Sequence, residues 1–137
     1  MEDTKIKKLK IFLKIYGVIS LLLFGFLFIM TAIDSPLMLE GGVLRDMRWE
    51  IAKHVDLMIE AIYIVWGVFM LLASRKPLAY LSFLQFTLWA NLVHGLVMVP
   101  QAFAMHYTHK FYTDIAYCLI LVVGLWLLKP KGEEQRM

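Results

Sequence analysis

The sequence predicts an all-α integral membrane protein, folded as an antiparallel up-down-up-down four-helix transmembrane bundle. The chain of 137 residues is 61% hydrophobic and 18% charged, and its mean hydropathy is strongly positive. A soluble domain of this size could not bury that much apolar surface. The apolar residues also fall into four runs that are long enough to cross a bilayer. Short connections between the runs favour antiparallel neighbours.

Turn and charge signals separate the four runs. Asp34-Ser35-Pro36 ends the first run, and a basic turn from Ser74 to Pro77 ends the second. Pro100 lies inside the third run and is expected to bend it. The length suggests one membrane domain that covers residues 1–137. The predicted spans are residues 11–33, 55–73, 78–105 and 111–128.

The distribution of lysine and arginine predicts the orientation. Ten of these residues belong to the N-terminal end, the turn after the second span and the C-terminal tail, and four belong to the other two connections. The positive-inside rule therefore places both termini in the cytoplasm. The same distribution argues against nucleic acid as a partner, because the net charge of +3 comes from residues at the ends of apolar runs.

Polar residues follow one face of the third span. At 100° per residue they fall within an arc of about 80° on one helix face. The second span shows a similar arc, and Asp114 lies on the fourth span. The face of the third span consists of Thr87, Asn91, His94, Met98, Gln101 and Met105, and that of the second of Asp56, Glu60, Tyr63, Gly67, Met70 and Ser74.

Helix geometry places several of these groups at a similar depth. With a rise of ~1.5 Å per residue, Glu60, Asp114, Asn91 and His94 lie about 20 to 24 Å above the cytoplasmic ends of their helices. In a hydrocarbon layer of roughly 30 Å that level is the outer third. A Glu60–His94 pair would reduce the cost of a carboxylate there. We therefore predict an outward-facing polar pocket formed by Glu60, His94, Asn91, Tyr63, Gln101, Asp56 and Asp114.

Other roles stay open for the same residues. Asn91 and Gln101 can serve as interhelical hydrogen-bonding groups, and Asp56 and Asp114 can be hydrated at the outer boundary. His106 and His109 suggest a metal site, but two histidines make an incomplete ligand set. A haem bound through His94 lacks a second axial ligand. No metal or other cofactor is therefore predicted. Cys118, the one cysteine, is expected to pack as a small hydrophobe.

Three classes of function remain. The first is binding or movement of a small molecule, a lipid-like ligand or a proton at the polar pocket. The second is a structural or accessory subunit of a membrane complex or homo-oligomer. The third is a membrane enzyme, which the sequence does not favour because no nucleophile or complete metal set accompanies the acid and the histidine. No catalytic residue is therefore predicted.

Residues 61–78 and 86–102 resemble a family of small bacterial membrane proteins of unknown function. The resemblance implies a four-span protein of the bacterial inner membrane, and it brings no activity. In size and number of spans the chain is also similar to the DoxX-type membrane proteins. The residues that carry the family resemblance are Tyr63, Gly67, Arg75, Pro77, Trp89, His94 and Gln101.

Overall fold

The computed structural model describes residues 3–39, 41–44 and 53–130. Throughout these residues the regular structure is helical. Four of the helical segments are long and apolar enough to cross a membrane, which confirms the predicted all-helical class. The elements are α1 (Thr4–Ala32), η1 (Pro36–Met38), α2 (Lys53–Arg75), η3 (Pro77–Tyr80), α3 (Leu81–Ala104), η4 (Thr108–Phe111) and α4 (Asp114–Leu128).

Helices α1, α3 and α4 begin at least three residues away from the start of the predicted spans; α3 begins at Leu81 rather than at residue 78, because the 3-10 helix η3 precedes it. Helix α1 begins at Thr4 rather than at residue 11, because lysines are good helix formers and the Asp3 carboxylate accepts a hydrogen bond from the Lys5 N–H at 3.1 Å. Helix α4 begins at Asp114 rather than at residue 111, since the preceding residues form the 3-10 helix η4.

The α1 and α3 helices end in the same way. Asp34 and His106 adopt positive φ angles of 51° and 56°. The next residue in each case donates its N–H back into the last turn, from Ser35 to Met30 at 3.0 Å and from Tyr107 to Ala102 at 2.8 Å. This is the Schellman arrangement, which satisfies carbonyl groups at a helix end.

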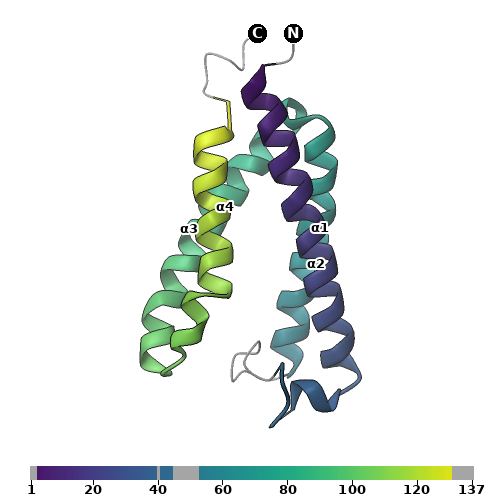
Figure 1. Cartoon of the computed structure of the whole chain (residues 1–137), viewed down its shortest axis with the longest axis vertical. Coiled ribbons are helices and arrows are strands. Elements are labelled where there is room, and N and C mark those ends of the chain that lie inside the picture. The colour runs from purple at the N-terminus through teal and green to yellow at the C-terminus, as the bar shows by residue number, and fades with distance from the viewer. Residues whose placement is uncertain (1–2, 40, 45–52, 131–137) are drawn as a thin grey trace. The chain divides into compact units, whose positions relative to one another are not determined.

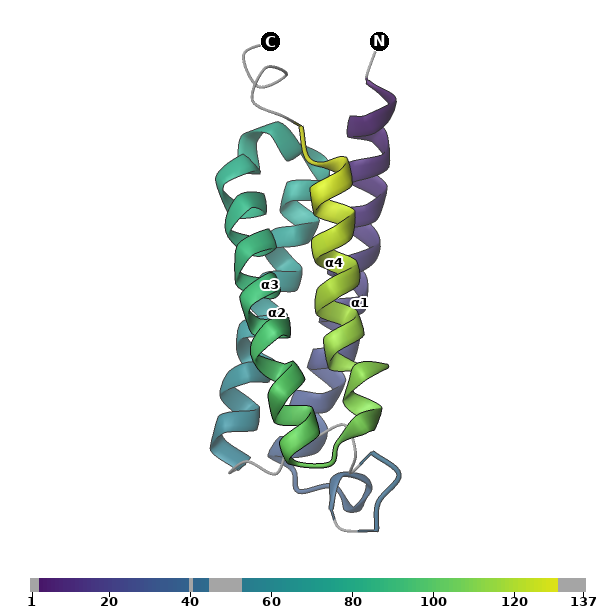
Figure 2. The same ribbon diagram turned by 90° about the vertical axis from the view of Figure 1, so that its left-hand side faces the viewer.

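The chain forms two compact units. The α1–α2 unit contains Leu13–Leu72, and the α3–α4 unit contains Met1–Phe12 with Ala73–Met137. Within the first unit, α1 and α2 run side by side in opposite directions (Figure 1). Within the second, α3 and α4 form an antiparallel pair (Figure 2). The start of α1, the turn before α3 and the end of α4 share one end of that unit.

Each unit buries apolar side chains, and many others are exposed along the spans, as expected for surfaces that contact lipid. Among the described residues, the core of the α1–α2 unit includes Leu13, Tyr16, Leu27, Met38, Tyr63 and Met70. That of the α3–α4 unit includes Leu9, Leu84, Leu88, Ile115, Leu121 and Leu125.

Candidate functional site

The predicted polar face of α2 is a buried face. Asp56 and Glu60 are each 7% exposed, and Tyr63, Gly67 and Met70 are also buried. These residues repeat at intervals of three and four, which aligns them along one side of a helix. The two acidic side chains are therefore held inside a segment that is apolar enough to cross a membrane.

Glu60 contacts the last turn of α1. The Thr31 hydroxyl donates a hydrogen bond to Oε1 of Glu60 at 3.1 Å, and Thr31 is itself buried. A hydroxyl donor stabilises carboxylate charge, and such bonds contribute more than those between neutral groups. The contact fixes the position of the Glu60 carboxyl group within the α1–α2 unit.

Aromatic stacking holds the next turn of α2. The Tyr63 ring stacks on Phe24 of α1 with a centroid distance of 4.5 Å and an interplanar angle of 15°. Trp66 stacks on Tyr63 at 5.9 Å. Stacked pairs of this kind restrict the motion of both rings, so the Tyr63 ring is held in one position, one turn from Glu60.

Small residues allow these contacts. A Cβ atom on Gly67 would lie 2.9 Å from Cβ of Ser20 and 3.1 Å from the carbonyl oxygen of Gly17. The backbones of α1 and α2 therefore approach closely at this level, as small residues permit in membrane helices. This close approach brings Glu60 and Tyr63 within reach of α1.

The polar residues of α3 are divided between buried and exposed positions. Thr87 and Asn91 are buried, whereas His94 and Gln101 are exposed. The buried face of α3 is rotated by roughly 50° from the predicted polar arc at 100° per residue. Gly95 lies on this buried face, next to Cys118 and Leu119 of α4. The buried residues of α3 are Leu84, Thr87, Leu88, Asn91, Gly95, Met98 and Ala102.

Asn91 is bonded within its own helix. Its Nδ2 donates to the carbonyl oxygen of Thr87 at 2.8 Å, and the side chain is 1% exposed. Its Oδ1 is buried with no hydrogen-bond partner among the residues that the structure describes. The interhelical interpretation required the amide to bridge α3 to another helix. The hydrogen bond of Nδ2 lies within α3 instead.

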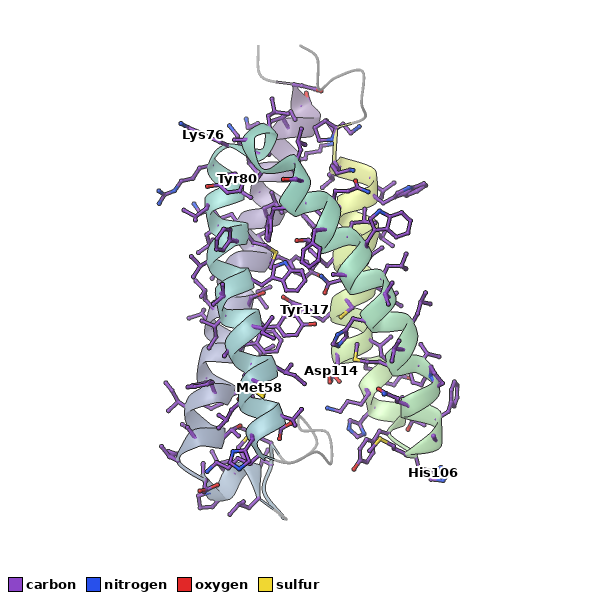
Figure 3. All side chains as sticks on the ribbon, turned by 180° about the vertical axis from the view of Figure 1, so that it is seen from behind. Met58, Lys76, Tyr80, His106, Asp114 and Tyr117 are labelled. Atoms are coloured by element: carbon purple, nitrogen blue, oxygen red, sulfur yellow. The ribbon has the colours of Figure 1, made fainter. Side chains whose placement is uncertain are left out.

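A buried lysine at the start of α4 was not predicted as a site residue. The Lys110 side chain is 0% exposed, and its Nζ lies 3.1 Å from Oδ2 of Asp114, which is 28% exposed. Asp114 also lies within electrostatic reach of His94. In Figure 3, Asp114 lies on α4 toward the end that carries His106, away from Lys76. The spacing of four residues between lysine and aspartate is a signal that the sequence contained.

The two histidines between α3 and α4 have local roles. His106 occupies the positive-φ position after α3 and is exposed. The His109 ring packs beside Tyr107 at a centroid distance of 5.5 Å. Within the described residues, no group of three or more histidine, cysteine, aspartate or glutamate side chains could hold a metal ion.

Comparison with known proteins identifies a family. A model described as a family of unknown function (DUF6632) matches residues 3–136. The chain belongs to this family. DUF6632 therefore covers nearly the whole chain, beyond the two stretches in which a resemblance was visible. Searches of curated proteins and of solved structures found no significant match.

For this DUF6632 protein the predicted site residues divide between the two units. Asp56, Glu60 and Tyr63 belong to the α1–α2 unit, and the remaining predicted site residues belong to the α3–α4 unit. The Glu60–His94 pairing therefore stays a prediction. Those remaining residues are Asn91, His94, Gln101 and Asp114.

Proposed function

We propose that this protein is a small polytopic membrane protein that binds or moves a ligand through the carboxyl groups of α2. The observation that carries the proposal is the burial of Glu60, with Asp56 one turn before it in the first turn of α2, in a helix long and apolar enough to cross a membrane. A charged carboxylate at the centre of a transmembrane helix costs at least about 2.5 kcal/mol on insertion scales. Acidic residues kept inside spans at such a cost mark ligand or ion pathways by default.

The chemistry of the site defines its ligand. Asp56 and Glu60 are four residues apart on one face, which places their Cβ atoms about 6 Å apart. Two carboxyl groups at that separation attract positive charge and hydrogen-bond donors. The ligand is therefore a proton, a small cationic molecule, or a lipid-like molecule with a donor in its polar part. The stacked rings of Tyr63 and Phe24 would lie beside the bound ligand.

Exchange of Glu60 for Gln tests this proposal. Protein solubilised gently from its own membrane should carry a non-protein mass in native mass spectrometry, and the Glu60→Gln variant should lose it. A proton as ligand is tested in proteoliposomes with an internal pH dye, where the same variant should lose acidification. Asp34→Asn is the matched control, because it removes a carboxylate from an exposed position of the same unit. Equal behaviour of Glu60→Gln and wild type in both assays would refute the proposal.

An accessory role in a membrane complex or homo-oligomer is the second candidate. The Thr31–Glu60 hydrogen bond favours it, because that bond connects α1 directly to α2. In this case Glu60→Gln and Thr31→Val should lower thermal stability in detergent by similar amounts. Native mass spectrometry should then show a stoichiometric protein partner or a second copy instead of a small ligand. We propose no enzymatic activity.

We propose the bacterial inner membrane as the location, with both termini in the cytoplasm and one four-helix domain. The asymmetry of lysine and arginine supports this orientation. Four of the counted cations, Arg45, Arg48, Lys131 and Arg136, lie outside the described residues. Single cysteines in a Cys118→Ala background test the orientation: an impermeant thiol reagent applied from outside should label a cysteine at residue 108 and not one at residue 7.

A further inference from the structure

The start of α1, the turn before α3 and the end of α4 lie at one end of the α3–α4 unit (Figures 1 and 2), and basic residues are concentrated in these segments. We call this cluster the basic rim. Among the described residues of that end, seven cations accompany one carboxylate, Asp3, which is engaged with the Lys5 N–H. The basic rim consists of Lys5, Lys7, Lys8, Lys10, Arg75, Lys76 and Lys129.

The basic rim is held in place by packing. Leu9 is fully buried, and the Phe12 ring lies directly against the backbone of Gly124, so the first turns of α1 are fixed on α4. Lys7 and Lys8 are exposed. Lys129 is fixed as well, because its Nζ donates a hydrogen bond to Oε1 of Gln85 on α3.

Apolar surface begins directly beneath the basic rim. Trp126 is 72% exposed and lies one turn before Lys129, and Ile11 is exposed immediately after Lys10. Tryptophan is enriched at the boundary between hydrocarbon and headgroups in membrane proteins. Figure 3 shows Tyr80 and Lys76 at the same end. These residues place the lysines at the depth of lipid phosphates.

We propose that the basic rim binds an anionic phospholipid. The lysines attract the negatively charged headgroup, and the exposed apolar side chains below them accommodate the acyl chains. A partner with a charged head and an apolar tail matches both halves of the surface, whereas a free phosphate ion matches the lysines alone. This inference is independent of the function proposed for Glu60, because the residues involved belong to the other unit.

Native mass spectrometry of the detergent-solubilised protein tests the lipid preference. The probes are phosphatidylglycerol and phosphatidylcholine with identical acyl chains, titrated at the same concentrations. Wild type should retain phosphatidylglycerol in preference. In Lys7→Gln/Lys8→Gln the preference should fall by about 30-fold, because the ~1 kcal/mol that each cation contributes near an anionic surface corresponds to about fivefold. Equal retention of the two lipids by wild type would overturn the proposal.

Matched variants separate charge from other effects. Lys7→Arg/Lys8→Arg keeps the charge and should keep the preference. Lys53→Gln removes a cation from the α1–α2 unit and should leave the preference unchanged. Inorganic phosphate, added at the concentration of the lipid, should not displace phosphatidylglycerol. Displacement by phosphate would show a site for free anions and would overturn the proposal, as would full preference in Lys7→Gln/Lys8→Gln.

Discussion

Gly67→Ala is the sharpest test of the packing between α1 and α2. A Cβ atom on Gly67 would lie 2.9 Å from Cβ of Ser20, 3.1 Å from the carbonyl oxygen of Gly17 and 3.2 Å from Cγ of Leu21. Optimal separations between carbon atoms are about 3.5 to 4.0 Å. Because Ser20 Cβ and the Gly17 carbonyl group are rigidly attached to α1, the two helices must separate by roughly half an ångström.

The net effect combines two opposing contributions. Overpacking of a well-packed contact costs about 1 to 3 kcal/mol. Replacing glycine by alanine inside a helix favours the helix by up to about 1 kcal/mol. We therefore expect Gly67→Ala to lower the free energy of unfolding by about 0 to 2 kcal/mol, whereas an unhindered glycine-to-alanine change would raise it by about 1 kcal/mol. The effects of Gly17→Ala and Gly67→Ala on the free energy of unfolding should not be additive, since the two residues adjoin.

The measurement is an unfolding titration with a denaturing detergent in mixed micelles, followed by circular dichroism and tryptophan fluorescence. Two other glycines provide internal controls. A Cβ on Gly25 would meet no heavy atom within 4 Å, so Gly25→Ala should stabilise the protein. A Cβ on Gly95 would meet Cys118 at an ordinary 3.5 Å, so Gly95→Ala should also stabilise the protein. If Gly67→Ala proves as stable as Gly25→Ala, the close approach of α1 and α2 is refuted.

Three further predictions concern single contacts, measured by the same titration. Asp114→Asn should lower the free energy of unfolding by about 3 kcal/mol, because it weakens the ion pair of the fully buried Lys110. The double variant Lys110→Met/Asp114→Leu should recover most of this loss. Equal losses in the two variants would contradict the prediction. His106→Gly should raise stability by about 1 kcal/mol, because glycine adopts a φ of 56° without strain, and a loss would contradict it. Tyr63→Leu should cost about 1 kcal/mol more than Tyr63→Phe, which keeps the ring stacked on Phe24, and equal values would exclude a contribution from stacking.

The face of α2 could be predicted from the sequence because its polar and small residues share one side. The periodicity that places Asp56, Glu60 and Tyr63 together also places Gly67 among them. In membranes small residues mark where helices approach, since apolar side chains gain little by leaving lipid. For α2, the polar residues and the small residues therefore indicated the same buried face. The particular contacts, Thr31 with Glu60 and Phe24 with Tyr63, required coordinates because they depend on the relative height of two helices.

The face of α3 could not be predicted in the same way. The prediction followed Asn91, His94 and Gln101, whose polarity defines an arc, and gave no weight to Gly95 and Ala102. Those two small residues are buried, and Gly95 lies against the side chains of α4. The buried face of α3 includes these small residues together with Thr87 and Asn91, whereas His94 and Gln101 are exposed. Polarity alone therefore did not separate the buried residues of this helix from the exposed ones.

Lys110 shows how a connection can be misjudged, and it bears on the proposed orientation. The sequence places it between two apolar spans, where a cation is expected to be hydrated and counts toward the charge of that side. In the structure the 3-10 helix η4 turns its side chain inward, and Asp114 one turn later neutralises it. An ion-paired, buried lysine adds little to surface charge. The count on that side then falls from four cations to three, against ten on the other, which strengthens the asymmetry that favours cytoplasmic termini.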